Sequence, residues 1–332
     1  MPKLPLDTPA AEDGGKVPRA PRGTPEAQAL IIGLNSRLQM LEKVRLSWWD
    51  HWRELANFIL PRRYVWLATP DRSDRGSPIN KRIINSTGTE AARKCASGIM
   101  SGVSSPSRPW FRLTVPDPDM QQDQDVQTWC DEVTNRMMRV MAGSGYYNAK
   151  ATQYLDLVVF GTSPLIIYED RETVIRCFVP AAGEYYCAVG PNFSVNTMFR
   201  KLTMTVAQVV AEFGYENCSV TVKSLYGQPD TTSNTTRMMG SWDTEIIVCH
   251  AIEPNPDYDR EPRSVGRNGL PRSFRYREVY WEESENEGML RISGFHDQPF
   301  SYPRWDTVAN DAYGRSPAMD ALGDIKQLQQ EE

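Results

Sequence analysis

The chain has 332 residues, of which 40% are hydrophobic and 24% charged, and its formal net charge is −5. This length allows one large or two medium domains with a sizeable core. The composition excludes a membrane-spanning helix, because no apolar run approaches the roughly 20 residues that cross a bilayer. The overall excess of acid argues against a protein that grips DNA tightly, since phosphate binding needs a positive surface.

The N-terminal residues 1–27 are predicted to be a disordered arm. The stretch from Pro2 to Pro25 is rich in Pro, Gly, Ala and charged residues, and it lacks the hydrophobic core of a secretory signal. A soluble, cytoplasmic protein follows from this. The six cysteines are far apart and form no C-x-x-C pair, so we expect buried free thiols. The three histidines cannot supply a strong zinc site, and we expect no metal or cofactor.

A long amphipathic helix is predicted from about Glu26 to Leu60, ended by Pro61. Its apolar face repeats at helical spacing through Leu34, Leu38, Leu41, Leu55 and Ile59. Trp48, Trp49 and Trp52 fall within one and a half turns, so they cannot all face one narrow core. Either they form the core and rim of one protein, or Trp49 or its neighbours pack on another subunit, because aromatic residues are enriched in interface cores.

The charge is distributed unevenly. Between Arg37 and Arg112 there are fourteen Lys or Arg against six Asp or Glu, so the remainder of the chain is distinctly acidic. Many of these cations lie in the polar segment 62–82, which is expected to be an exposed loop. This basic segment either is solvated, contacts DNA, or contacts the acidic part of a neighbouring copy of the chain. The candidate interface or DNA-proximal residues are Arg62, Arg63, Arg75 and Trp49.

Three further helices are predicted before residue 161. One starts near Thr87, where Thr87 and Glu90 have the spacing of a capping box. Its predicted packing face consists of small and apolar residues: Ala92, Cys95, Ala96, Ile99 and Val103. A strand over 110–115 follows. Helices are then expected over about 123–141, with seven apolar residues on one face, and over about 147–160, capped by Gly161.

The pattern after Gly161 changes to a period of two, which is typical of strands. Hairpins are predicted over 164–179 and 185–202, and a short helix over 205–213. Further strands are expected over 245–252, 274–282 and 289–294. The last helix begins at Ser316-Pro317, a hydroxyl N-cap followed by proline. It reaches the final residue without a cap, so we expect the native sequence to continue.

The order of these elements predicts the α+β class, with N-terminal amphipathic helices followed by a mostly antiparallel β region. The expected division is a disordered arm (1–27), a helical region (28–160), a β-rich region (161–310) and the start of a truncated helix (311–332).

Catalytic chemistry is not predicted. The G-x-S-x-G elbow, the P-loop and the G-x-G-x-x-G motif are absent from the sequence. His250 lies in an apolar strand, and Asp257 and Asp259 lie in a Pro-rich loop that lacks the rigidity a catalytic metal requires. We therefore expect a protein that is not an enzyme. The alternatives from other classes are a hydrolase or nuclease that uses these three residues, and a DNA-binding module.

Five stretches of the sequence together carry a family pattern. They are Leu38–Arg45 with Trp48–Trp52 and Phe58–Arg63; Asn85–Arg93 with Ala96–Gly102 and Ser105–Leu113; Val159–Thr162; Met204–Val210 with Phe213–Gly214; and Tyr313–Leu322. In their order and spacing, across roughly Leu34 to Leu328, they resemble the head-to-tail connector, or portal, proteins of short-tailed bacteriophages.

The resemblance implies a structural protein of the virion. Such proteins form rings of twelve at one capsid vertex, assembled in the host cytoplasm, through which DNA is packaged and ejected. The implied partners are other copies of the chain, the terminase motor, scaffold and capsid proteins, a tail adaptor, and double-stranded DNA that passes without sequence specificity. The present segment resembles the outer wing, and the stem, clip and tunnel would follow Leu328. Another virion structural protein, such as a tail adaptor, is the alternative.

Overall fold

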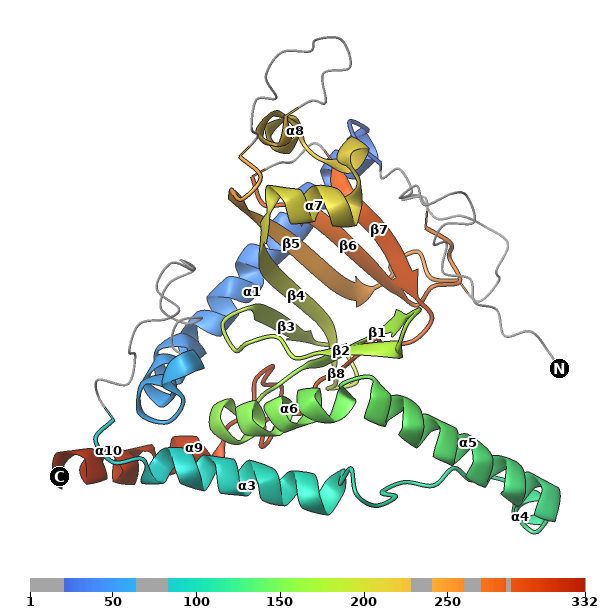
Figure 1. Cartoon of the computed structure of the whole chain (residues 1–332). Coiled ribbons are helices and arrows are strands. Elements are labelled where there is room, and N and C mark those ends of the chain that lie inside the picture. Colours follow the sequence, from blue (N-terminus) through green and yellow to red (C-terminus); the bar gives the residue numbers. More distant parts are fainter. Residues whose placement is uncertain (1–20, 64–82, 228–240, 260–269, 285–287, 332) are drawn as a thin grey trace, which may run out of the picture. The chain divides into compact units, whose positions relative to one another are not determined.

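The structure is a computed structural model that describes residues 21–63, 83–227, 241–259, 270–284 and 288–331 (Figure 1). The first part of the chain is mainly helical: α1 (Pro25–Phe58), α3 (Thr87–Val103), α4 (Pro118–Gln121), α5 (Gln124–Gly143) and α6 (Tyr146–Phe160). The strands are β1 (Leu165–Asp170), β2 (Val174–Phe178), β3 (Tyr185–Val189), β4 (Val195–Thr205), β5 (Glu245–Pro254), β6 (Tyr276–Glu282), β7 (Met289–Phe295) and β8 (Phe300–Ser301). The remaining helices are α7 (Val206–Phe213), the 3₁₀ turn η1 (Tyr215–Asn217), α8 (Val220–Tyr226), α9 (Pro317–Asp320) and α10 (Leu322–Glu331).

These elements confirm the α+β class: helices come first, and antiparallel strands follow. The long first helix, both hairpins and the three later strands lie where the sequence predicted them, within a few residues. Helices α4 and α8 and strand β8 were not predicted.

Two compact units are formed, and each draws on separate parts of the chain. The first, here called the sheet unit, comprises Met1–Arg45 and Tyr185–Gln298. The second, the helical unit, comprises Leu46–Glu184 and Pro299–Glu332. Helix α1 contributes its first part to the sheet unit and its last part to the helical unit. The division expected from the sequence follows chain order instead, and its boundaries stay predictions; most of the expected N-terminal arm lies outside the described residues.

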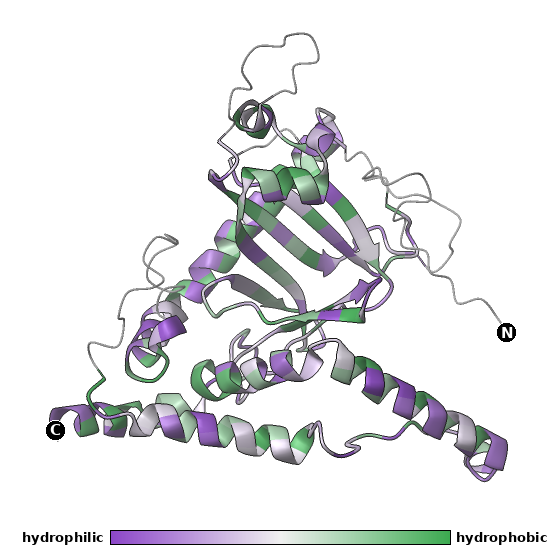
Figure 2. Ribbon diagram, viewed as in Figure 1, coloured by the Kyte–Doolittle hydropathy of each residue, from purple (hydrophilic) through white to green (hydrophobic). Residues whose placement is uncertain are grey.

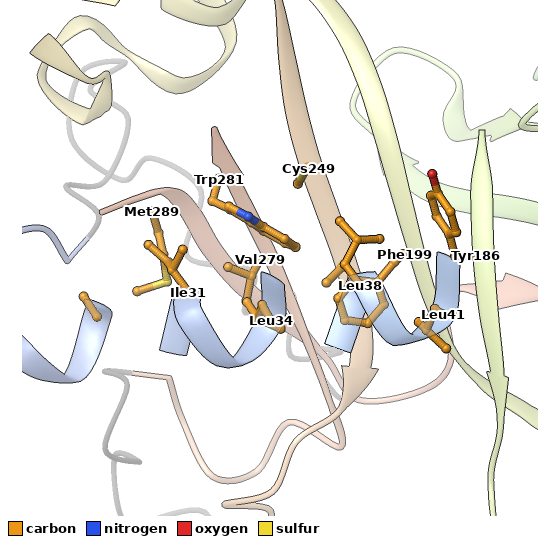
Figure 3. Packing of buried hydrophobic residues seen from close by; sticks show 12 residues of the cluster. Ile31, Leu34, Leu38, Leu41, Tyr186, Phe199, Cys249, Val279, Trp281 and Met289 are labelled. Atoms are coloured by element: carbon orange, nitrogen blue, oxygen red, sulfur yellow. The ribbon is translucent and has the colours of Figure 1, made fainter. Parts of the chain in front are cut away.

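The sheet unit is built on a five-stranded antiparallel sheet in the order β3-β4-β5-β6-β7. Alternation along the strands divides the buried side chains between its two faces. One face packs against the apolar stripe of α1, as Figure 3 shows. The residues in this cluster include Ile31, Leu34, Leu38, Leu41, Tyr186, Phe199, Cys249, Val279, Trp281 and Met289. The predicted stripe of α1 is thus confirmed as a core face in this unit.

The opposite face of the sheet packs against α7 and α8. Val206, Val209 and Phe213 of α7 are buried there against Tyr280 and other residues of the sheet. Helix α7 begins with a complete capping box, in which Thr205 accepts from the backbone of Gln208 and the Gln208 side chain accepts in return. The sheet is therefore covered on both faces, and its central strands are buried.

The helical unit combines α3, α5, α6, α9 and α10 with a small antiparallel sheet in the order β2-β1-β8. Helix α6 is its centre: eight of its fifteen residues are buried, including Tyr154, Val159 and Phe160. Helix α3 packs along α6, and α9 approaches the same helix. The end of α1 contributes Trp52, Leu55 and further buried residues to the core of the unit.

Several local predictions in the helical unit are wrong. Helix α3 has Ser86 as its N-cap without a side-chain cap bond, so Thr87 and Glu90 form no capping box. Its buried side is Gly88, Ala92 and Ala96, whereas Cys95 and Val103 are exposed. Cys95 therefore also departs from the expected set of buried thiols.

Residues 110–115 form no strand, because they run beside α5 rather than beside another strand. The Leu113 amide donates to the Thr134 hydroxyl of α5 at 3.1 Å, and the Arg112 guanidinium pairs with Asp131 at 2.8 Å. Helix α5 also departs from expectation: of its seven-residue apolar face only Cys130 is fully buried, and Trp129 is 60% exposed.

Candidate functional site

The three tryptophans of α1 have different environments within the helical unit. Trp52 is fully buried, with its ring edge-on to Phe160 at 6.4 Å and to Tyr313 at 5.2 Å between centroids. Trp48 is half-buried beside Tyr313, with 6.0 Å between the ring centroids, and the Arg315 guanidinium lies over the Trp48 ring. Trp49 is half-buried. The three side chains therefore divide into a core residue and two rim residues, and Trp49 stays the candidate for contact with another subunit.

The candidate arginines lie just after α1, where Pro61 follows the end of the helix. Arg62 is exposed. Arg63 turns inward, and its guanidinium meets the carboxylate of Asp156 on α6, with 3.1 Å between Nε and Oδ1 and 3.1 Å between Nη2 and Oδ2. Arg75 lies outside the described residues. The two neighbouring arginines therefore differ in their surroundings, which the sequence pattern did not distinguish.

Asp156 is the electrostatic counterpart of Arg63. Its side chain is only 3% exposed, and this burial raises the pKa of the carboxyl to about 6, against the opposing effect of the Arg63 charge. A buried ionised carboxylate is costly without a cation beside it. The ion pair therefore joins the segment after α1 to α6.

Two of the family stretches meet at a close backbone contact. Gly161 has a φ of +74°, and a Cβ atom there would lie 2.2 Å from the carbonyl oxygen of Gly314. The Gly314 amide donates to the Thr162 hydroxyl at 2.7 Å, and the Ser316 hydroxyl donates to the Val159 carbonyl at 2.7 Å. Only a residue without a side chain fits at Gly161. The stretches Val159–Thr162 and Tyr313–Leu322 thus form one structural node.

The other stretches of the helical unit join the same region. The Thr89 hydroxyl of α3 donates to the Ile59 carbonyl at 2.8 Å, and the Ser104 hydroxyl lies 2.8 Å from the Tyr154 hydroxyl of α6. Gly88 leaves room for Ile325 of α10, whose side chain would lie 3.1 Å from an added Cβ. Three of the five stretches therefore lie wholly in the helical unit, the stretch around α7 lies in the sheet unit, and the first stretch, along α1, contributes to both.

His250 occupies a sealed polar network inside the sheet unit. Its Nδ1 accepts a hydrogen bond from Arg200 Nε at 3.1 Å, so the ring proton resides on Nε2 and is shared with Glu278 Oε1 at 2.9 Å. Ser293 donates to the other oxygen of Glu278 at 2.6 Å. Burial is the main cause that lowers the pKa of His250 to about 4, so the ring is neutral at physiological pH. His250 is fully buried and therefore cannot reach a substrate.

A second buried carboxylate, Glu253, lies on the same strand. Its Oε2 is 2.6 Å from Arg37 of α1, and its Oε1 accepts from Arg277 Nε at 2.8 Å. Neither network is evident from the sequence. The available signal is that polar residues, such as His250 and Glu278, stand among apolar ones in strands β5 and β6. The residues that pair with them come from distant segments of the chain.

The residues considered for catalysis, His250, Asp257 and Asp259, do not form a metal site. Asp257 and Asp259 lie after β5 at half-buried and exposed positions, whereas the His250 side chain is fully buried. Within the described residues, no group of three or more His, Cys, Asp or Glu side chains is arranged to hold a metal ion.

Comparison with known proteins identifies the family. Residues 33–332 match the family model described as bacteriophage head to tail connecting protein. The chain belongs to this connecting-protein family. A probable portal protein of Bordetella phage BPP-1 is 38% identical over 300 residues, and the portal protein of Salmonella phage epsilon15 is 37% identical over 302 residues. Each alignment covers 90% of this chain and 51% of the relative, so the chain spans about half the length of these curated relatives.

Among the helices in the described part of this connecting protein, none combines the length and the hydrophobicity needed to cross a bilayer.

Proposed function

We propose that this chain forms part of a portal ring at one vertex of a phage capsid, through which DNA is packaged and later ejected. The observation that carries the proposal is the family match, which extends from residue 33 to residue 332. Both relatives described above are named portal proteins. The acidic net charge of −5 agrees with a protein that does not grip DNA tightly, because phosphate binding needs a positive surface. Neither relative's name favours a tail adaptor.

The proposed partners follow from this role. They are other copies of the chain, the terminase motor, scaffold and capsid proteins, and a tail adaptor. The proposed ring contains twelve copies of the chain. Duplex DNA would pass through the channel without sequence specificity. The proposed location is the portal vertex of the virion, after assembly in the host cytoplasm.

Trp49, Arg62 and Arg75 are the residues that we propose for subunit or DNA contact. Trp49 is half-buried and Arg62 is exposed, so both have surface to offer a partner. Arg63 shares the proposal in a different way: its ion pair with Asp156 holds the start of the basic segment against α6. Arg63 therefore acts by positioning the adjacent Arg62.

We propose that the protein works without a catalytic centre. Its family is described as connecting head to tail. The His250 network, which most resembles a catalytic constellation, is enclosed by the sheet unit and already fully paired. The test is a nuclease and hydrolase assay of the complete gene product with Mg²⁺ and Mn²⁺. Turnover that is lost on replacing His250, Asp257 or Asp259 by alanine would overturn this part of the proposal.

Electron microscopy and native mass spectrometry of the complete gene product test the ring. Rings with a central channel are expected, with a mass equal to twelve subunits. A protein that stays monomeric at high concentration would refute the proposal, and rings of another number would refute only the stoichiometry.

Charge reversal tests the proposed contact residues within that ring. Arg62→Glu and Arg75→Glu should lower the yield of rings while the melting temperature stays unchanged. Arg275→Glu, at a 59% exposed arginine of the sheet unit, is the matched control. Rings formed by both test variants at the wild-type yield would exclude Arg62 and Arg75 from the interface.

A further inference from the structure

Helix α5 presents an apolar stripe to solvent. Trp129, Val133, Met137 and Val140 follow one another at spacings of four, four and three residues, which places them on one side of the helix. Trp129 is 60% exposed and Met137 is 38% exposed, and both valines are partly exposed. Figure 2 shows hydrophobic positions interspersed with hydrophilic ones along α5. An exposed row of this kind marks an interaction surface.

The packing of α5 within its own chain uses a different side of the helix. Cys130 and Thr134 are buried, and residues 112–115 lie along that side. Figure 1 shows α5 extending from α6 toward α4. The amphipathic face predicted from the sequence thus divides into an inner line that packs within the chain and an outer stripe that does not.

The charge around the stripe indicates the chemistry of its partner. Residues 116–125, which include α4 and the start of α5, are all exposed. They carry Asp117, Asp119, Asp123 and Asp125, and there is no Lys or Arg between Leu113 and Asn135. A complementary partner surface would carry positive charge opposite this acidic end. Beside that charge it would have room for the large apolar side chains of the stripe.

The outer face of α3 has this character. Lys94 is exposed on it, and Arg108 folds back over the end of the helix, where its guanidinium donates to the Ser101 carbonyl at 3.0 Å. Gly98 and Gly102 lie on the same face, and an added Cβ at either position would meet no atom within 4 Å. The exposed Glu90 lies one turn before Lys94, so the basic part of this face is the stretch from Lys94 to Arg108, where the two glycines leave it free of bulky side chains.

We propose that the apolar stripe of α5 in one copy of the chain packs on the outer face of α3 in a second copy. The charge complementarity of the two faces, both carried by every copy, identifies the partner as another subunit. The contact joins unlike faces, which is the type of interface that closes a ring. The inference rests on the proposed portal function, for which it names the surfaces in contact.

Disulfide crosslinking of the complete gene product tests the contact, because Cys95 is naturally exposed on α3. Single variants W129C, V133C and M137C are oxidised mildly after native mass spectrometry has established that rings are present. At least one variant should give covalent dimers and higher multimers on a non-reducing gel, and C95S in the same variant should abolish them. N135C, exposed on the other side of α5, is the matched control.

The outcomes separate the two proposals. Rings whose stripe variants crosslink no more than N135C overturn the α5–α3 contact and leave the portal function intact. A crosslink only within one chain also overturns the contact, because it shows that the same subunit covers the stripe. Absence of rings before oxidation overturns the portal function itself.

Truncation of the stripe gives an independent measurement. W129A should raise the protein concentration needed for half-assembly by roughly tenfold or more, since buried tryptophans dominate interfaces. N135A should leave it unchanged, and both variants should keep the wild-type melting temperature because both side chains are exposed. Equal assembly of W129A and wild type would contradict the proposal.

Discussion

Arg63 is held against Asp156 by two contacts of 3.1 Å, one between Nε and Oδ1 and one between Nη2 and Oδ2. The adjacent Arg62 points to solvent. We therefore expect these two adjacent arginines to differ strongly in how much their substitution destabilises the protein.

Arg63→Ala should destabilise the protein by about 3 kcal/mol at pH 7.5, because a buried carboxylate is left without its cation. The folded pKa of Asp156, about 6, lies above its ordinary value of 3.8, so the folded state takes up the proton first as the pH falls. The deficit should therefore be smaller at pH 5 than at pH 7.5. Chemical denaturation at the two pH values measures it. Arg62→Ala is the control and should change stability by less than about 0.5 kcal/mol.

The His250 network should make the sheet unit sensitive to acid. Burial holds the pKa of His250 at about 4, below its ordinary value of 6.5, so only the unfolded state gains a proton between these values. Stability should fall as the pH drops from about 6.5 to 4. His250→Gln should flatten this part of the curve in urea titrations, whereas His296→Gln should leave it in place. An unchanged slope in His250→Gln would contradict the assignment of a neutral histidine.

The same network predicts a second loss at lower pH. Burial by itself would raise the pKa of Glu278, but hydrogen bonds from His250 and Ser293 bring it to about 2, below the ordinary 4.5. Its stabilisation is therefore present above pH 4.5 and is lost as the pH falls toward 2. Glu278→Gln should remove this component, as measured by the acid limb of the denaturation curve. Ser293→Ala should weaken it partially.

Gly161→Ala should cost about 2 kcal/mol or more, because the residue has a positive φ and its Cβ would collide with the Gly314 backbone. The control is Gly33→Ala in the third turn of α1, where an added Cβ meets nothing within 4 Å. That variant should gain about 0.5–1 kcal/mol from helix propensity. Thermal melts of the two variants should therefore shift in opposite directions.

Leu34→Ala should destabilise the sheet unit by about 2–4 kcal/mol, since it leaves a cavity between α1 and the sheet. Ile32→Ala, two residues earlier at a 55% exposed position, should change stability by less than about 0.5 kcal/mol. Equal effects of the two substitutions in denaturant titrations would contradict the described orientation of α1.

Local periodicity was enough to predict most elements of the fold. The apolar spacing of α1 and the alternation around β3 and β4 depend on neighbours along the chain, which a sequence displays directly. The same reasoning was wrong for residues 110–115, where alternation reflects contact with α5 rather than strand pairing. It also predicted one face of seven apolar residues on α5, of which only Cys130 is fully buried.

The candidate site was harder to predict because its contacts join distant residues. Arg63 and Asp156 are 93 positions apart, and Arg200 and His250 are 50 apart. Nothing in the sequence marks such pairs. The family stretches around Gly161 and Gly314 were recognised by their letters, and their shared role became visible only through the backbone contact between them.

The interleaving of the two units has a consequence for synthesis on the ribosome. The stripe of α1 emerges early, whereas its partners Phe199, Val279 and Trp281 are translated much later. At a translation rate of about 5–20 residues per second, Leu34 and Leu38 remain without their packing partners for on the order of ten seconds or longer. During that interval the nascent chain exposes the apolar face of α1. The yield of folded protein in a cell should therefore depend on chaperones that bind exposed apolar segments.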